Sequence, residues 1–176
     1  PETGTKERKF QGMVAAPEMV FKGLDSGEFR VSDFIGKVVV LNFWATWCPP
    51  CRAEIPHLSD LYFAYKDKGV VVIGVSMDKA GVGHVRKFSE NIGIPYPLAI
   101  GVFTDIERIL SPLEGIPVVQ DIRNAPEIGN GSVRVIPTTF IIDKGGNIYR
   151  KHVGARDREY LESEINGLLG LDAMEN

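Results

Sequence analysis

The sequence predicts an α/β fold in which helices flank a mixed central sheet. Strand-sized apolar runs alternate with helix-sized segments through most of the chain, and a hairpin followed by one more helix ends it. The 176 residues are 44% hydrophobic and 24% charged, which is an ordinary composition for a globular protein. A chain of this length buries enough surface for one substantial core.

The expected strands span 19–22, 28–31, 37–44, 70–75, 96–100, 138–143 and 147–153. The first two form a small hairpin around Asp25-Ser26-Gly27. The runs 37–44 and 70–75 are almost continuously apolar, which is typical of strands that are buried on both faces. The last two strands flank Lys144-Gly145-Gly146, and this tripeptide is a strong hairpin signal.

The expected helices span 49–68, 82–91, 103–110 and 157–169. The first carries an apolar stripe at helical spacing, which runs from Leu58 through Leu61 to Tyr65. In the last, Asp157 is a candidate N-cap and Gly170 stands close to the end. Strands and helices therefore follow each other in the order expected of a sandwich with a mixed sheet.

We expect one domain over 13–170, preceded by a flexible polar leader over 1–12 and followed by a tail over 171–176. Within the domain, residues 113–132 are rich in proline and glycine and predict an irregular insertion. No apolar run approaches the ~18 residues that span a bilayer, and a first residue of Pro1 predicts a mature or trimmed form. A net charge of −3 without a basic run argues against a nucleic-acid partner.

The only two cysteines are Cys48 and Cys51, and Pro49 and Pro50 separate them. A disulfide that closes so small a ring constrains little of the unfolded chain, so chemistry explains the pair better than stability does. A zinc site would need two more ligands, and the three histidines are scattered along the chain. We interpret the pair as a redox-active disulfide that needs no metal or organic cofactor, with zinc ligation and inert buried thiols as the lesser alternatives.

The pair stands where a buried strand ends and a helix begins. Pro49 fits the first helical turn, and Cys48 falls near the N-cap, where the helix dipole favours a thiolate. The dipole lowers the thiol pKa from ~8.5 to no lower than about 7. A thiol of this pKa suits a reductase better than a strong oxidase. We expect Cys48 to be exposed and to attack a partner's disulfide, and Cys51 to be shielded and to resolve the mixed disulfide.

Several ordered motifs resemble a known family. The run VLNFWATWCPPC, residues 40–51, resembles the active-site strand and turn of thioredoxin-like proteins. Pro56 resembles the proline inside the family's active-site helix, and IPTTFIID, residues 136–143, resembles its cis-proline loop and following strand. The resemblance spans about 19–169 and implies a thioredoxin fold with an N-terminal hairpin and a strand–helix insertion over 82–100. Within the superfamily, the chain is most similar to the TlpA/ResA group of bacterial extracytoplasmic thiol reductases.

The resemblance also implies a surface that contacts the substrate. It implies that the Ile136–Pro137 bond is cis, which turns the loop toward the cysteines and lets the Ile136 backbone pair with an extended substrate strand. Trp47 then offers a flat apolar contact next to the cysteine pair, together with Pro49 and Pro50.

The resemblance also implies that a carboxylate, Glu54, accepts the proton of the inner cysteine, Cys51. Asn42 stands where thioredoxins carry a buried Asp, and its amide cannot take the proton of the inner cysteine. Glu54 lies three residues after Cys51 on the same helix face, so we expect a partly desolvated side chain with a raised pKa that accepts this proton. The alternative is an ordinary first-turn carboxylate that is exposed to water.

The resemblance implies a thiol–disulfide oxidoreductase that reduces extracytoplasmic proteins, for example in cytochrome c maturation. Protein thiols and disulfides are the expected substrates, an upstream membrane thiol reductant is the expected partner, and a monomer is the expected state. We expect a periplasmic or extracytoplasmic location and leave open an anchor upstream of Pro1. A thiol oxidase or isomerase is one alternative, and a copper-handling protein with Cys48 and Cys51 as soft ligands is another. The insertion over 113–132 is either a tolerated surface loop or a determinant of partner choice.

Overall fold

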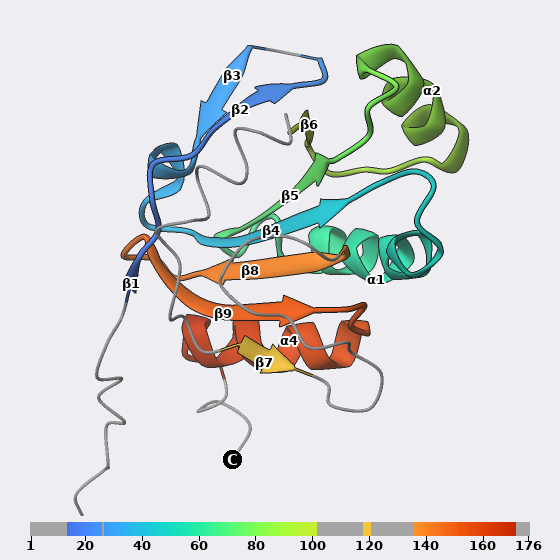
Figure 1. The fold of residues 1–176 in the computed structure, drawn as a ribbon. Coiled ribbons are helices and arrows are strands. Elements are labelled where there is room, and N and C mark those ends of the chain that lie inside the picture. The colour runs from blue at the N-terminus through green and yellow to red at the C-terminus, as the bar shows by residue number, and fades with distance from the viewer. Residues whose placement is uncertain (1–13, 26, 102–117, 121–135, 172–176) are drawn as a thin grey trace, which may run out of the picture.

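The structure of the chain is a computed structural model, and it describes residues 14–25, 27–101, 118–120 and 136–171 (Figure 1). These residues form a nine-stranded mixed sheet, three α-helices and one 3₁₀ helix. The strands are β1 Val14–Ala15, β2 Val20–Gly23, β3 Glu28–Arg30, β4 Val38–Trp44, β5 Val70–Ser76, β6 Leu98–Ile100, β7 Val118–Gln120, β8 Thr138–Ile142 and β9 Asn147–Val153. The helices are η1 Val31–Phe34, α1 Pro49–Tyr65, α2 Val82–Ile92 and α4 Arg158–Leu169.

The predicted fold class is confirmed, and every predicted element that falls within the described residues is present. Bounds differ by a few residues; α1, for example, ends at Tyr65 instead of at 68. At α4, Asp157 is the N-cap and accepts a hydrogen bond from the backbone N–H of Tyr160 at 2.9 Å, as predicted. The leader over 1–12 and the helix expected over 103–110 lie outside the described residues. None of the described helices is long and apolar enough to cross a bilayer.

The sheet order is β1-β9-β8-β4-β5-β6-β2-β3, and β7 also pairs with β9. The strands β4, β5 and β6 run parallel to each other, whereas β4 pairs antiparallel with β8 and β8 pairs antiparallel with β9. The N-terminal hairpin, β2 and β3, joins the sheet through antiparallel pairing of β2 with β6. The strand that leads into the cysteine pair, β4, is therefore a central strand of the sheet.

Strand β7 was not predicted. It lies within the segment 113–132, whose other residues are outside the described part of the chain. Two valines and a glutamine are too short a run to signal a strand between prolines and glycines. In the sheet, Gln120 pairs with Val153, which pairs in turn with Thr138 of β8. The chain thus leaves β7 at the end of the sheet where the Ile136–Pro137 loop enters β8.

Two apolar cores lie on opposite faces of the sheet. Alternate residues of β4 face opposite sides, so Val40 and Trp44 join one core whereas Leu41 and Phe43 join the other. All three α-helices contribute to the first core, and α1 packs against both β5 and α4. The second core includes the N-terminal hairpin and η1. Helix α1 is thus held rigidly against the centre of the sheet.

The register of β4 and β8 brings two distant segments together. Phe43, near the end of β4, pairs with Thr138, the first residue of β8. The turn that follows β4 and the loop that precedes β8 consequently meet at one end of the sheet (Figure 1). This end carries the cysteine pair and the Ile136–Pro137 bond.

Close packing at the centre of β5 requires a glycine. A Cβ added at Gly74 would lie 2.7 Å from Cδ2 of Leu98, 3.0 Å from Nε1 of Trp44 and 3.2 Å from Cε2 of Tyr96. These are ring or branched side-chain atoms in the first core, so they have little freedom to move aside.

We expect Gly74→Ala to lower the free energy of unfolding by about 1–3 kcal/mol, because the added methyl overpacks the core. Gly83→Ala in α2 is the matched control, since a Cβ there meets nothing within 4 Å. The control should be neutral or stabilising by about 0.5–1 kcal/mol. Urea denaturation of both variants measures the difference, and equal stabilities would contradict this account of the packing.

Candidate active site

The cysteine pair stands at the N-terminus of α1, directly after β4. Cys48 is the N-cap, and its Sγ accepts a hydrogen bond from the backbone N–H of Cys51 at 3.3 Å. Pro49 and Pro50 fill the first two helical positions, where a missing N–H removes no helical hydrogen bond. Cys48 and Cys51 form a disulfide with a Cα–Cα distance of 5.2 Å. The predicted placement of Cys48 in the positive end of the helix dipole is confirmed.

A cis-proline loop faces the disulfide. The Ile136–Pro137 peptide bond is cis, as the family resemblance implied. The carbonyl oxygen of Ile136 lies 3.7 Å from Sγ of Cys48. On the other side of the loop, the Pro137 carbonyl accepts a hydrogen bond from the backbone N–H of Gly154 at 2.8 Å. The loop is therefore held between the disulfide and the end of β9.

The prediction that Cys48 is exposed is wrong for the disulfide form. Cys48 is only 3% exposed and Cys51 only 1% exposed, although the shielding of Cys51 was predicted. Cys48 is buried because its sulfur lies against Ile136 and its side chain joins the first core. The exposed apolar group is instead its neighbour Trp47, which is 67% exposed, as predicted for a contact surface.

The side chain of Glu54 on α1 is buried and accepts two hydrogen bonds. Its side chain is 1% exposed, so the alternative of a solvated first-turn carboxylate is wrong. Oε2 accepts from Nδ2 of Asn42 at 3.0 Å, and Oε1 accepts from the backbone N–H of Arg156 at 3.1 Å. Desolvation by burial raises the pKa of Glu54 to about 7, against the opposing effect of these hydrogen bonds and of the nearby Arg156 charge. The predicted raised pKa is confirmed.

A row of polar side chains continues from Glu54 across the sheet. Nδ2 of Asn42 also donates to Oγ1 of Thr139 at 2.9 Å. Asn42, Thr139 and His152 are cross-strand partners on β4, β8 and β9, so their side chains share one face of the sheet. His152 is fully buried and its ring meets Tyr160 edge-on at 5.2 Å between centroids. Burial lowers the pKa of His152 to about 4, and the Arg156 and Arg150 charges add to this effect.

Sequence reasoning missed Thr139, His152 and Arg156. Arg156 contributes its backbone N–H, which no side-chain pattern reports. Lysine is almost never fully buried, so the run Lys151-His152 did not signal a strand end that is covered on both faces. Thr139 pairs with Asn42 and with His152. The pairing of Asn42 with Thr139 joins strands that lie far apart in the sequence, so no local pattern reports it.

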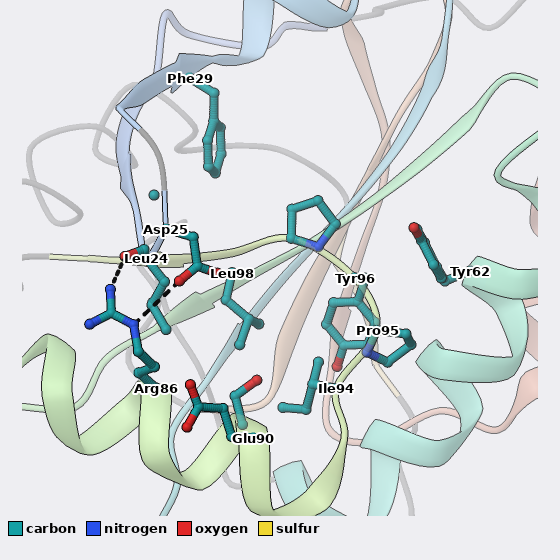
Figure 2. Close-up of a pocket in the computed structure, with 13 residues that line it drawn as sticks. Leu24, Asp25, Phe29, Tyr62, Arg86, Glu90, Ile94, Pro95, Tyr96 and Leu98 are labelled. Carbon is teal, nitrogen blue, oxygen red and sulfur yellow. Dashed lines mark hydrogen bonds and ion pairs between the residues drawn. The ribbon is translucent and has the colours of Figure 1, made fainter.

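The described residues also line two hollows. Figure 2 shows a pocket of about 400 Å³ between the N-terminal hairpin, α2 and the segment before β6. At its edge, Nε of Arg86 donates to the Asp25 carboxylate at 3.3 Å, and the same guanidinium donates to the Leu24 carbonyl. A groove of about 610 Å³ runs beside α1 and is lined by Arg52 and Ile92 among others. Neither hollow is lined by a cysteine or by Glu54.

The disulfide, the facing cis-proline and the buried carboxylate define a class of protein. A disulfide ring of four residues at a helix N-terminus contributes little stability and is suited to thiol exchange. On the α/β sheet described above, this arrangement is that of a thioredoxin-fold thiol–disulfide oxidoreductase.

Comparisons with known proteins identify the family. The AhpC/TSA family matches residues 14–151. The chain is 34% identical over 159 residues to a protein named thiol-disulfide oxidoreductase ResA from Bacillus cereus, which covers 90% of this chain and 79% of the relative. It is 34% identical over 154 residues to a protein of the same name from Geobacillus kaustophilus, with coverage of 87% and 75%. The chain therefore belongs to the AhpC/TSA family of thioredoxin-like proteins and, within it, to the ResA-like thiol-disulfide oxidoreductases.

Solved structures agree with this assignment. A thiol:disulfide interchange protein of the thioredoxin family from Chlorobium tepidum has a TM-score of 0.74 and 26% identity, over 91% of this chain and 99% of the neighbour. A putative thiol:disulfide interchange protein DsbE from Chlorobium tepidum has a TM-score of 0.72 and 31% identity, with the same coverage. The thioredoxin fold implied by the active-site motifs is thus confirmed.

Burial of Glu54 predicts a pH-dependent stability. Its pKa is about 7 in the folded protein and 4.5 in its ordinary state, so the folded form holds an extra proton between these values. The contribution of Glu54 to the free energy of unfolding should therefore fall as pH rises from about 4.5 to about 7, by up to about 3 kcal/mol. Urea denaturation of the oxidised wild type and of Glu54→Gln at a series of pH values should show this contribution as the difference between their two slopes.

The buried His152 acts with the opposite sign, so its contribution has to be separated from that of Glu54. Its folded pKa of about 4 lies below the ordinary 6.5, so the stability that depends on neutral His152 is lost as pH falls through this range. Because the pH ranges of Glu54 and His152 overlap, the slope of Glu54→Gln is subtracted from that of the wild type to leave the Glu54 contribution. A Glu54→Gln variant with the wild-type slope between about 4.5 and 7 would contradict the burial effect.

Proposed function

We propose that this chain is a reductant of disulfides in extracytoplasmic proteins, with apocytochrome c as one example of a substrate. The observation that carries the proposal is the small number of backbone N–H groups that donate a hydrogen bond to the Cys48 sulfur. It accepts one helix N–H, from Cys51, and Pro49 and Pro50 supply none. Weak stabilisation of the thiolate favours the disulfide form of the protein, and such a protein gives electrons to its partner.

The reaction begins from the reduced protein. The Cys48 thiolate attacks one sulfur of the substrate disulfide, a new S–S bond forms, and the other substrate sulfur leaves as a thiolate. Cys51 then loses its proton and attacks Sγ of Cys48, which releases the second substrate thiolate. Two electrons have passed to the substrate, and Cys48 and Cys51 end as the disulfide seen here. An upstream membrane dithiol recharges the protein, and neither a metal nor an organic cofactor takes part.

Glu54 is proposed to accept the Cys51 proton. It lies three residues along α1 from Cys51, so the two side chains share a helix face. Its pKa of about 7 suits a group that takes and returns a proton near neutral pH. Asn42 cannot titrate, but its amide orients Oε2 of Glu54 by hydrogen bonding.

The substrate is proposed to bind over the rim of the redox turn. Trp47, Pro49 and Pro50 are exposed and offer apolar contact, and the Ile136 backbone supplies pairing for an extended substrate strand. Because Cys48 is buried in the oxidised form, the substrate must approach its sulfur between Trp47 and the Ile136–Pro137 loop. We propose that the protein works as a monomer in the periplasm or an equivalent extracytoplasmic space.

The reduction potential tests the direction of electron flow. Equilibration of the purified protein with glutathione or dithiothreitol buffers should give a value near the ~−270 mV of thioredoxin, or lower. A value near the ~−120 mV of a strong oxidant would support a thiol oxidase and reject the proposed direction.

Trapping variants test the roles of the two cysteines. We expect Cys51→Ser to accumulate covalent complexes with a disulfide-containing protein substrate, because Cys48 attacks and nothing resolves the product. Cys48→Ser should accumulate none, since Cys51 lies inside the first turn of α1 and not at its N-cap. Non-reducing gel electrophoresis after quenching measures the complexes. Equal trapping by both variants would reject the assignment of Cys48 as the attacking residue.

A further inference from the structure

A buried carboxylate outside the disulfide region is hydrogen-bonded to the turn that carries Cys48. Asp78 lies two residues after the end of β5 and is 6% exposed. Its Oδ2 accepts from the backbone N–H of Thr46 at 2.9 Å and from Oγ of Ser76 at 2.7 Å, and its Oδ1 accepts from Oγ1 of Thr46 at 2.6 Å. Two of the three donors therefore belong to one residue, Thr46.

Thr46 also links this carboxylate to helix α2. Its hydroxyl has one proton, which it donates to Asp78 because a carboxylate has none to give. The 3.0 Å contact between Oγ1 of Thr46 and Nε2 of His84 must then run from the imidazole, so Nε2 carries a proton. His84 stands in the first turn of α2, so a chain of directed hydrogen bonds runs from α2 through Thr46 to Asp78.

The hydrogen-bonded residue is part of the redox turn. The backbone N–H of Cys48 donates to the carbonyl of Ala45 at 3.3 Å, and Thr46 lies within this turn. The backbone direction at Thr46 thus sets where the N-cap Cys48 begins α1. It also sets how Sγ of Cys48 lies against the Ile136 carbonyl, at 3.7 Å.

We propose that Asp78 is a positioning residue for Cys48, which acts by holding Thr46 and therefore the turn in which the attacking sulfur is presented. His84 extends this hold to α2, so the helix and the redox turn move as one unit. The inference rests on Cys48 being the attacking sulfur, as proposed above, and it holds for either direction of electron flow.

The test compares Asp78→Asn with a matched control at the opposite end of the sheet. Asp143 holds the β8–β9 turn in the same manner, since its Oδ1 accepts from the backbone N–H groups of Gly145 at 2.9 Å and Asn147 at 2.8 Å. Asp143→Asn makes the same chemical change at a turn far from the cysteines. Both variants are compared with the wild type for urea stability, exchange equilibrium with glutathione, and the pH midpoint of Cys48 alkylation by iodoacetamide.

We expect Asp78→Asn to raise the pH midpoint of alkylation and to shift the exchange equilibrium toward the disulfide by about tenfold, because the sulfur loses its place at the helix N-terminus. Removal of a negative charge alone would favour the thiolate and lower the midpoint, so the direction of the shift identifies positioning. Asp143→Asn should lower the stability and leave both other measurements at their wild-type values.

An unchanged or lowered midpoint in folded Asp78→Asn overturns the inference, whatever its stability. If Asp78→Asn does not fold, Thr46→Val decides, since it removes the hydroxyl and keeps the charge and the branched shape. A raised midpoint in Thr46→Val supports the inference, and a wild-type midpoint overturns it. Wild-type protein in which Cys48 is alkylated no faster than Cys51 would instead reject the proposed role of Cys48.

Discussion

The assembled sheet and helices of this protein enclose a buried carboxylate, Glu54, which lies on the same helix as the disulfide. Glu54 is 1% exposed, and the folded chain supplies it with two hydrogen bonds rather than with water. Those donors come from β4 and from the segment before α4, so the carboxylate is tolerated only when the sheet and both helices are assembled. Burial still dominates and raises the pKa of Glu54 to about 7.

This constraint links the fold to the redox turn. Helix α1 carries Cys51 and Glu54 three residues apart, and the sheet beneath it carries Asn42 and Thr139 at paired positions. The same sheet brings the turn after β4 next to the loop before β8, so Sγ of Cys48 lies 3.7 Å from the carbonyl oxygen of Ile136, the residue before the cis-proline. A helix N-terminus favours a thiolate only modestly, which gives a role to the proton acceptor proposed above, Glu54.

Local patterns in the sequence predicted the parts of the site that are contiguous in the chain. The order of strand, cysteine pair and helix predicted the N-cap position of Cys48, and the spacing from Cys51 predicted a desolvated Glu54. The burial of Cys48 was missed because it comes from Ile136, 88 residues away. The backbone of Arg156, the pairing of Thr139 with His152 and the three-residue strand β7 are likewise set by tertiary contacts that no short-range pattern reports.

A direct titration of the Glu54 side chain tests the central claim that the fold raises the pKa of this carboxyl group to about 7. The ¹³Cδ resonance of Glu54, assigned by comparison with Glu54→Gln, can be followed in the oxidised protein across the pH range. We expect a midpoint of about 7. A midpoint at the ordinary value of 4.5 would mean that water reaches the carboxylate, and it would contradict the account.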